Sequence, residues 1–157
     1  MSEREMLRHA LATLAYRGGK AVRGAADRFG DFKTEAAIRT PGQVLAHIGD
    51  LLDWSLALAD GQHVWHDSAP APWPEEVARF FRALARLDAR LASDLPLGFS
   101  EKQLFQGPIA DALTHVGQIT MLRRMFGSPL RGENYLQADI VAGRVGPEQS
   151  APRREFE

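Results

Sequence analysis

Apolar residues recur at the three- and four-residue spacing of an α-helix in four separate segments of this chain. In the second segment the apolar positions are Val44, Ile48, Leu51, Leu52, Trp54 and Leu58. No part of the sequence shows the apolar–polar alternation of a half-buried strand. The pattern therefore predicts an all-α fold, an up-and-down four-helix bundle whose helices bury their apolar faces against one another.

Capping signals predict where these helices begin and end. Ser2 with Glu5, and Thr40 with Gln43, have the spacing of a capping box, in which side chains satisfy the first free backbone N–H groups. Gly18-Gly19 interrupts the first pattern and predicts either a kink or a close contact between helices. The predicted helices begin near Ser2, Thr40, Pro74 and Gly107 and end near Gly30, Gly61, residue 93 and Gly127.

The bundle is expected to occupy residues 1–127, and residues 128–157 are expected to form a C-terminal extension. That extension is rich in proline, glycine and mixed polar residues, which is typical of irregular structure. We expect one short helix in it, around Tyr135 to Ala142, followed by disorder. Ser100 to Gln103 is expected to start a further short helical turn before the fourth helix.

Composition excludes several classes of function. The 157 residues are 45% hydrophobic and 25% charged with a formal net charge of -1, which suits one globular domain and argues against nucleic-acid binding. The chain has no cysteine, so it has no disulfide, no zinc–thiolate site and no thiol nucleophile of its own. No apolar run is long enough for a membrane span, and the polar N-terminus is unlike a signal peptide. We therefore expect a cytoplasmic protein that binds neither nucleic acid nor a membrane.

Two histidines fall where the helices should be apolar. At about 100° per residue, His47 lies about 20° from Trp54 on the apolar side of its helix, and His115 lies about 20° from Leu122. Asp111 precedes His115 by one helical turn and so lies beneath it. Imidazole and carboxylate are common ligands of first-row metals, so these three residues are candidate metal ligands.

The expected bundle geometry would bring the three candidates together. In an up-and-down bundle the second and fourth helices are parallel, and His47 and His115 each lie about 10 Å from the start of their helix. Two imidazoles and one carboxylate on one side of an ion leave positions open for water or substrate. Gln118 is predicted to contact the same site, and Asp50 is a candidate for orienting the His47 ring.

Simpler interpretations remain open for each of these residues. A single histidine on an apolar face is usually a core residue with satisfied hydrogen bonds. Asp111 near a predicted helix start is also explained by a favourable interaction with the helix dipole. Asp50 and Asp53 are typical of a solvated helix face, and His63 and His66 are typical of loop residues, with a second metal site as the alternative.

The segment from Gly107 to Ile119, in which His115 leads into Gly-Gln-Ile after one valine, resembles the fourth helix of the DinB/YfiT-like family of metalloenzymes. His47, followed by Ile-Gly-Asp-Leu-Leu-Asp-Trp, resembles the histidine on that family's second helix. The tail sequences from Gly132 to Tyr135 and from Ala138 to Ile140 are similar to the end of some members. Together these motifs span most of the chain.

The resemblance implies a four-helix bundle that holds a divalent metal, such as Zn, Ni, Fe or Mn, through three side chains that are usually histidines. His47 and His115 match two of these ligands, and the third position is Asp111 in this chain. Several members transfer a low-molecular-weight thiol, such as bacillithiol, mycothiol or glutathione, to an electrophile, and one branch isomerises maleylpyruvate. The resemblance therefore implies a metal-dependent transferase with a small-molecule substrate, in which a thiol cofactor supplies the sulfur that this chain lacks.

Two other functions are compatible with the same residues. One is a non-catalytic bundle that binds a small ligand or a partner, with a metal site degraded by the aspartate. The other is a metal-dependent hydrolase, which needs only water in place of the thiol. Bundles of this size often form homodimers, and the sequence leaves that option open.

Overall fold

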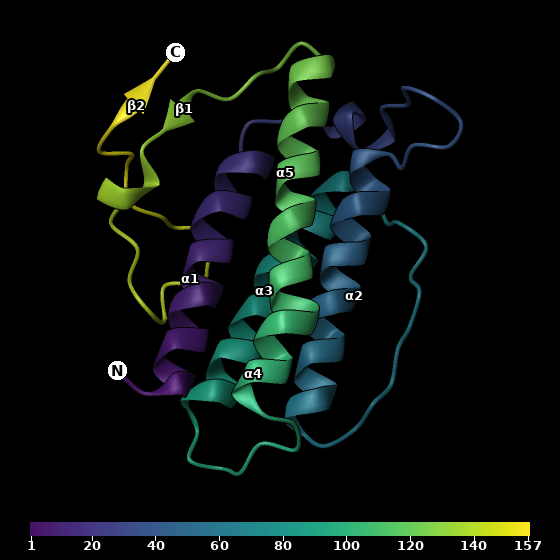
Figure 1. Ribbon diagram of the computed structural model, residues 1–157. Coiled ribbons are helices and arrows are strands. Elements are labelled where there is room, and N and C mark those ends of the chain that lie inside the picture. The colour runs from purple at the N-terminus through teal and green to yellow at the C-terminus, as the bar shows by residue number, and fades with distance from the viewer.

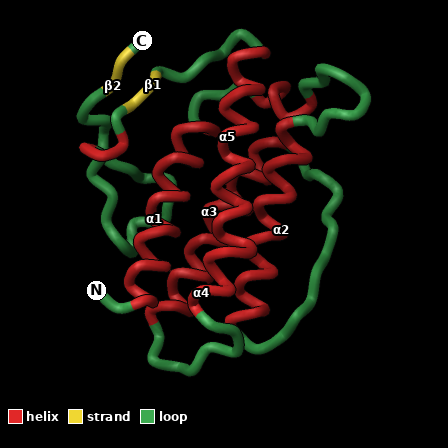
Figure 2. Tube along the Cα trace, in the orientation of Figure 1, coloured by secondary structure: helices red, strands yellow, loops and turns green.

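The computed structural model describes residues 1–157 and is mostly helical (Figure 1). Four long helices, α1 (Glu3–Val22), α2 (Pro41–Ala59), α3 (Trp73–Ala92) and α5 (Ala110–Met125), lie side by side, and the short α4 (Glu101–Leu104) precedes α5. Figure 2 shows the only strands, β1 (Gly132–Glu133) and β2 (Glu155–Phe156), which pair antiparallel beside the bundle. The predicted helical class is therefore confirmed, with a minor sheet added. None of the helices combines the length and the apolar character needed to cross a membrane.

The predicted capping boxes start the first two helices. The Ser2 hydroxyl accepts a hydrogen bond from the Glu5 N–H at 3.2 Å, and the Thr40 hydroxyl accepts one from the Gln43 N–H at 3.2 Å. In both boxes a side-chain oxygen of the later residue accepts a hydrogen bond from the backbone N–H of the cap residue. The third helix begins at Trp73, one residue before the proline that the sequence suggested.

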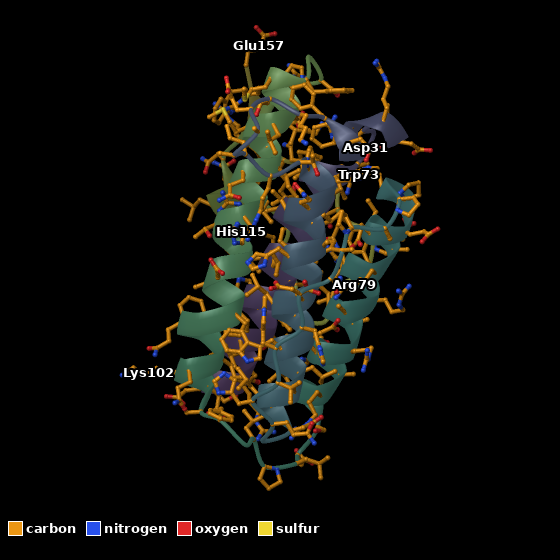
Figure 3. All side chains as sticks on the ribbon, turned by 90° about the vertical axis from the view of Figure 1, so that its right-hand side faces the viewer. Asp31, Trp73, Arg79, Lys102, His115 and Glu157 are labelled. Atoms are coloured by element: carbon orange, nitrogen blue, oxygen red, sulfur yellow. The ribbon has the colours of Figure 1, made fainter.

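The order of helix directions differs from the up-and-down order that was predicted. Arg79, early in α3, binds Asp50 at the middle of α2 at 2.6 Å, whereas Arg90, late in α3, binds Asp60 at the end of α2 at 2.6 Å. The two helices are therefore parallel, and the connection between them returns along the side of the bundle (Figures 1 and 3). Twelve extended residues reach about 40 Å while α2 spans about 28 Å, so residues 61–72 are long enough to make this crossover.

The helical run that ends in α5 begins earlier than the predicted fourth helix. A capping box of Ser100 and Gln103 starts α4, and the chain continues through a π-helical turn, Phe105–Ile109, directly into α5. Pro108 lies inside this turn rather than at a helix start, and the Ala110 N–H bonds back to the carbonyl of Phe105. The wider turn accommodates a proline because it does not depend on the missing N–H for an ordinary α-helical bond. The predicted start at Gly107 is therefore wrong.

A close contact between α1 and α3 explains one of the two adjacent glycines. A Cβ atom added to Gly18 would lie 2.6 Å from Cζ of Phe80, a fully buried ring in the core. The sequence predicted either a kink at Gly18-Gly19 or a close contact between helices. Because α1 continues to Val22, beyond the glycines, the close helix contact is the alternative observed. The residues expected to extend the first helix form a separate 3-10 helix, Asp27–Asp31.

The C-terminal extension packs on α1 instead of leaving the bundle. The buried carboxylate of Glu133 accepts hydrogen bonds from the Tyr16 hydroxyl at 2.6 Å and from the Lys20 ammonium at 2.8 Å. Lys20 also binds Glu155 at 2.9 Å, on the strand that pairs with the one holding Glu133. The expected short helix is limited to Tyr135–Gln137, and the segment expected to be disordered returns to form β2.

Candidate metal centre

Helices α2 and α5 bring His47, Asp111 and His115 together, as the sequence predicted. One donor atom from each side chain can be chosen so that all three lie within 4.8 Å of one another. The two imidazole rings have centroids 4.7 Å apart and are nearly perpendicular, at 82°. His115 lies at mid-height on the side of α5 that faces α2 (Figure 3).

The three residues meet although the predicted parallel orientation of their two helices is wrong. A Cβ atom added to Gly107, ahead of α5, would lie 4.0 Å from the ring of Trp54, late in α2, while His115 lies beside His47, early in α2. The two helices are therefore antiparallel. The histidines share a level because α2 descends past the middle of α5, and not because they are equally far from two parallel helix starts.

The distances from Asp111 to each histidine are close to the donor spacing around a bound first-row metal ion. One Asp111 oxygen lies 3.8 Å from Nε2 of His47 and the other lies 3.5 Å from Nε2 of His115. Bonds of about 2.1 Å at a tetrahedral ion place neighbouring donors about 3.4 Å apart. The histidine side chains are 18% and 13% exposed and that of Asp111 is 48% exposed, so the centre opens to solvent on the Asp111 side.

The simpler explanation of Asp111 as an acid at a helix start does not fit the structure. Because α4 and the π turn continue into α5, Asp111 lies about three turns inside a helical run that begins at Glu101. The dipole effect is confined to the first and last turns of a helix. The Asp111 carboxylate instead lies within 3.8 Å of a ring nitrogen of each imidazole, and Thr114 is its other polar neighbour, at 3.4 Å.

Burial keeps His47 in the form that can bind a metal. Its pKa is lowered from the usual 6.5, first by burial, then by the neighbouring His115 and by the charge of Arg39. Asp111 and Asp50 oppose this shift but do not reverse it. A lowered pKa leaves the imidazole neutral at neutral pH, so its lone pair is available to an ion without the loss of a proton.

Gln118 contacts the centre as predicted, and it selects a tautomer of His115. Its side-chain oxygen lies 3.0 Å from Nδ1 of His115. An amide oxygen only accepts hydrogen bonds, so Nδ1 carries the proton and donates it to Gln118. In the neutral ring this leaves Nε2 of His115 unprotonated, and Nε2 is the atom that faces Asp111.

Asp50 does not have the predicted role. Its carboxylate accepts hydrogen bonds from the N–H and hydroxyl of Ser68 at 2.9 and 2.6 Å and from Arg79 at 2.6 Å, and none from His47. At 4% exposure it is not part of a solvated face either. Asp53 shares the same arginine at 2.9 Å. These bonds hold the crossover between α2 and α3 against α2.

The crossover adds a residue to the centre that the sequence did not reveal. The Trp65 ring lies 5.6 Å from that of His47 and 5.8 Å from that of Trp54, edge to face in both cases. His63 stacks on Trp54 at 5.6 Å, away from the metal candidates, and His66 is not part of any cluster of metal donors. Trp65 lies in the connection between α2 and α3, so helical periodicity could not predict its position, which depends on the path of this connection.

Two hollows flank the centre. One of about 720 Å³ borders His115 and is lined mainly by apolar side chains of α5 and of the connection before α2. The other, about 370 Å³, borders His47 and is lined mainly by polar residues of α2 and of the crossover. Arg39, just before α2, borders both hollows. It could not be identified from the sequence, because a single arginine in a loop belongs to no motif or periodic pattern.

Comparisons with known proteins found no match among family models, curated proteins or solved structures.

Proposed function

We propose that the protein is a divalent-metal-dependent enzyme that transfers a low-molecular-weight thiol to a small electrophile. The observation that carries the proposal is the meeting of His47, Asp111 and His115, with donor atoms within 4.8 Å of one another and one side open to solvent. Two imidazoles and a carboxylate suit Zn, Ni, Fe or Mn. The resemblance to the DinB/YfiT-like family supports a thiol as the second reactant.

A divalent ion at this centre would lower the pKa of a thiol or water bound to it. The residues of the chain prepare the site for that ion. His47 is neutral because of its burial, and Gln118 holds the proton of His115 on the nitrogen that faces away from Asp111. The Trp65 ring packs edge to face against the His47 ring. The chain has no cysteine, so the thiol must be a separate molecule.

Asp111 adjusts the charge of the site. A carboxylate leaves a divalent ion with a net charge of +1, whereas three neutral imidazoles leave +2. The ion is then a weaker Lewis acid, and a bound thiol, which is intrinsically far more acidic than water, is the nucleophile less affected by that loss. This charge difference favours thiol over water as the reactant.

A combined assay tests the proposal. Metal-free protein is titrated calorimetrically with zinc, nickel and manganese, and the loaded samples are then assayed for consumption of glutathione by a chloronitrobenzene. We expect metal-dependent thiol consumption that is lost in His115→Ala. Ester hydrolysis without thiol would identify the hydrolase instead, and failure to bind any metal would leave the non-catalytic bundle.

A further inference from the structure

Arg39 is a free cation beside the metal centre. It is exposed, and unlike Arg79 and Arg90 it is not bound to a carboxylate. It borders both hollows, one of which includes His47 and the other His115. Its charge reaches His47, whose pKa it helps to lower. A guanidinium in this position is available to pair with an anionic group of a ligand.

The larger hollow presents an apolar wall next to this cation. Its lining includes Ile38, Met121 and Met125, whose exposed fractions are 45%, 54% and 55%. Methionine side chains are unbranched and adapt to apolar groups of different shapes. The volume of about 720 Å³ lies within the range of sites for small organic molecules, about 300–1,000 Å³.

We infer that the substrate of this centre is an apolar organic monoanion, with its carboxylate on Arg39 and its alkyl or aryl body against Met121 and Met125. The inference rests on the proposed metal-dependent function, because the hollow ends at His115. In the larger hollow Arg39 is the only arginine or lysine, which suits one negative charge rather than the several charges of a polyphosphate. The apolar wall accounts for the remainder of the ligand.

Binding of a matched pair of probes tests the assignment. Octanoate and octanamide have the same chain and differ in charge, and their affinities are measured by calorimetry on zinc-loaded wild type, Arg39→Gln and Lys33→Gln. Lys33 is exposed in the same connection but lines neither hollow, so it controls for net charge. We expect Arg39→Gln to weaken octanoate about tenfold and to leave octanamide unchanged, with Lys33→Gln affecting neither. Met121→Ser should weaken both probes.

Two results would overturn the inference. One is equal affinity of wild type for octanoate and octanamide, and the other is octanoate binding that survives Arg39→Gln because the carboxylate binds zinc directly. A parallel zinc titration of the same variants separates this outcome from failure of the proposed function. Wild type that binds no zinc refutes the metal centre, whereas zinc binding without Arg39-dependent octanoate binding refutes only the substrate class.

Discussion

Replacing Asp111 by alanine tests the metal centre most directly. The residue supplies one of three donors, with oxygens 3.5 and 3.8 Å from the histidine nitrogens. Removing a group that only contacts a ligand lowers metal affinity about 10–100-fold, so losing the ligand itself should cost at least about 100-fold. The fold should tolerate the change, because the side chain is 48% exposed and lies about three turns into the helical run that begins at Glu101. We expect an effect on stability within about 0.5 kcal/mol.

Thermal unfolding with added metal converts this loss into a measurable shift. At a metal concentration 100 times the wild-type Kd, binding stabilises the native state by about 2.7 kcal/mol. A 100-fold weaker site at the same concentration gives only about 0.4 kcal/mol. For a chain of this size, 1 kcal/mol corresponds to about 2–4 °C in Tm, so a shift of about 5–11 °C should fall to about 1–2 °C.

Two further variants complete the experiment. Asp94→Ala removes another exposed acid, one outside the site, and should keep the full metal-induced shift. Asp111→His keeps three donors and should retain the metal while lowering the pKa of a bound thiol or water, since the ion then carries a higher net charge. A metal-induced shift in Asp111→Ala equal to that of wild type would refute the assignment of Asp111 as a ligand.

Three other predictions concern the surroundings of the centre. Gln118→Leu should lower metal affinity about 10–100-fold in calorimetry, because His115 loses the partner that holds its proton on Nδ1; unchanged affinity would contradict that role. Gly18→Ala should destabilise the protein by about 1–3 kcal/mol in urea unfolding, because its Cβ would overlap Phe80. The control Gly117→Ala, whose Cβ would have no neighbour within 4 Å, should stabilise the protein by up to about 1 kcal/mol. Stability changes of the same sign in the two variants would argue against the close contact between Gly18 and Phe80. The pKa of His47 in the folded protein is lowered from its usual 6.5, so its contribution to the stability of metal-free protein should be complete above about pH 6.5 and decline below it. In His47→Gln the free energy of unfolding should fall less steeply as the pH drops below 6.5. An unchanged dependence on pH would show that another group is responsible.

The starts of α1 and α2 were predictable because capping boxes act within four residues of sequence. The apolar faces of α2 and α5 placed His47 and His115 on the core side of their helices, because such a face is a property of each helix alone. The level at which the two residues meet was predicted from parallel helices, whereas the helices are antiparallel. The direction of α3 was not predictable in the same way. A twelve-residue connection permits either a nearby antiparallel helix or a crossover to a parallel one, and tertiary bonds such as Arg79 to Asp50 decide between them.

Other parts of the site depend on features that leave no local pattern. Trp65 reaches His47 only because the crossover runs beside α2, and Asp50 is buried only because Ser68 and Arg79 come to it. The proline at position 108 was misleading for a different reason. Proline usually marks the first turn of a helix, and here a π turn lets the helix continue through it.

That π turn also limits which insertions and deletions the chain can accept. A π turn contains about one residue more than an α turn, so it rotates the preceding segment by about 100° relative to the following one. In this arrangement Leu104 is fully buried in the core while His115 faces α2. Deleting Gly107 would restore an α-helical register and turn one of those two residues away by about a quarter of a turn. Relatives that keep this centre should therefore preserve the number of residues between positions 104 and 115 even where the residue types have changed.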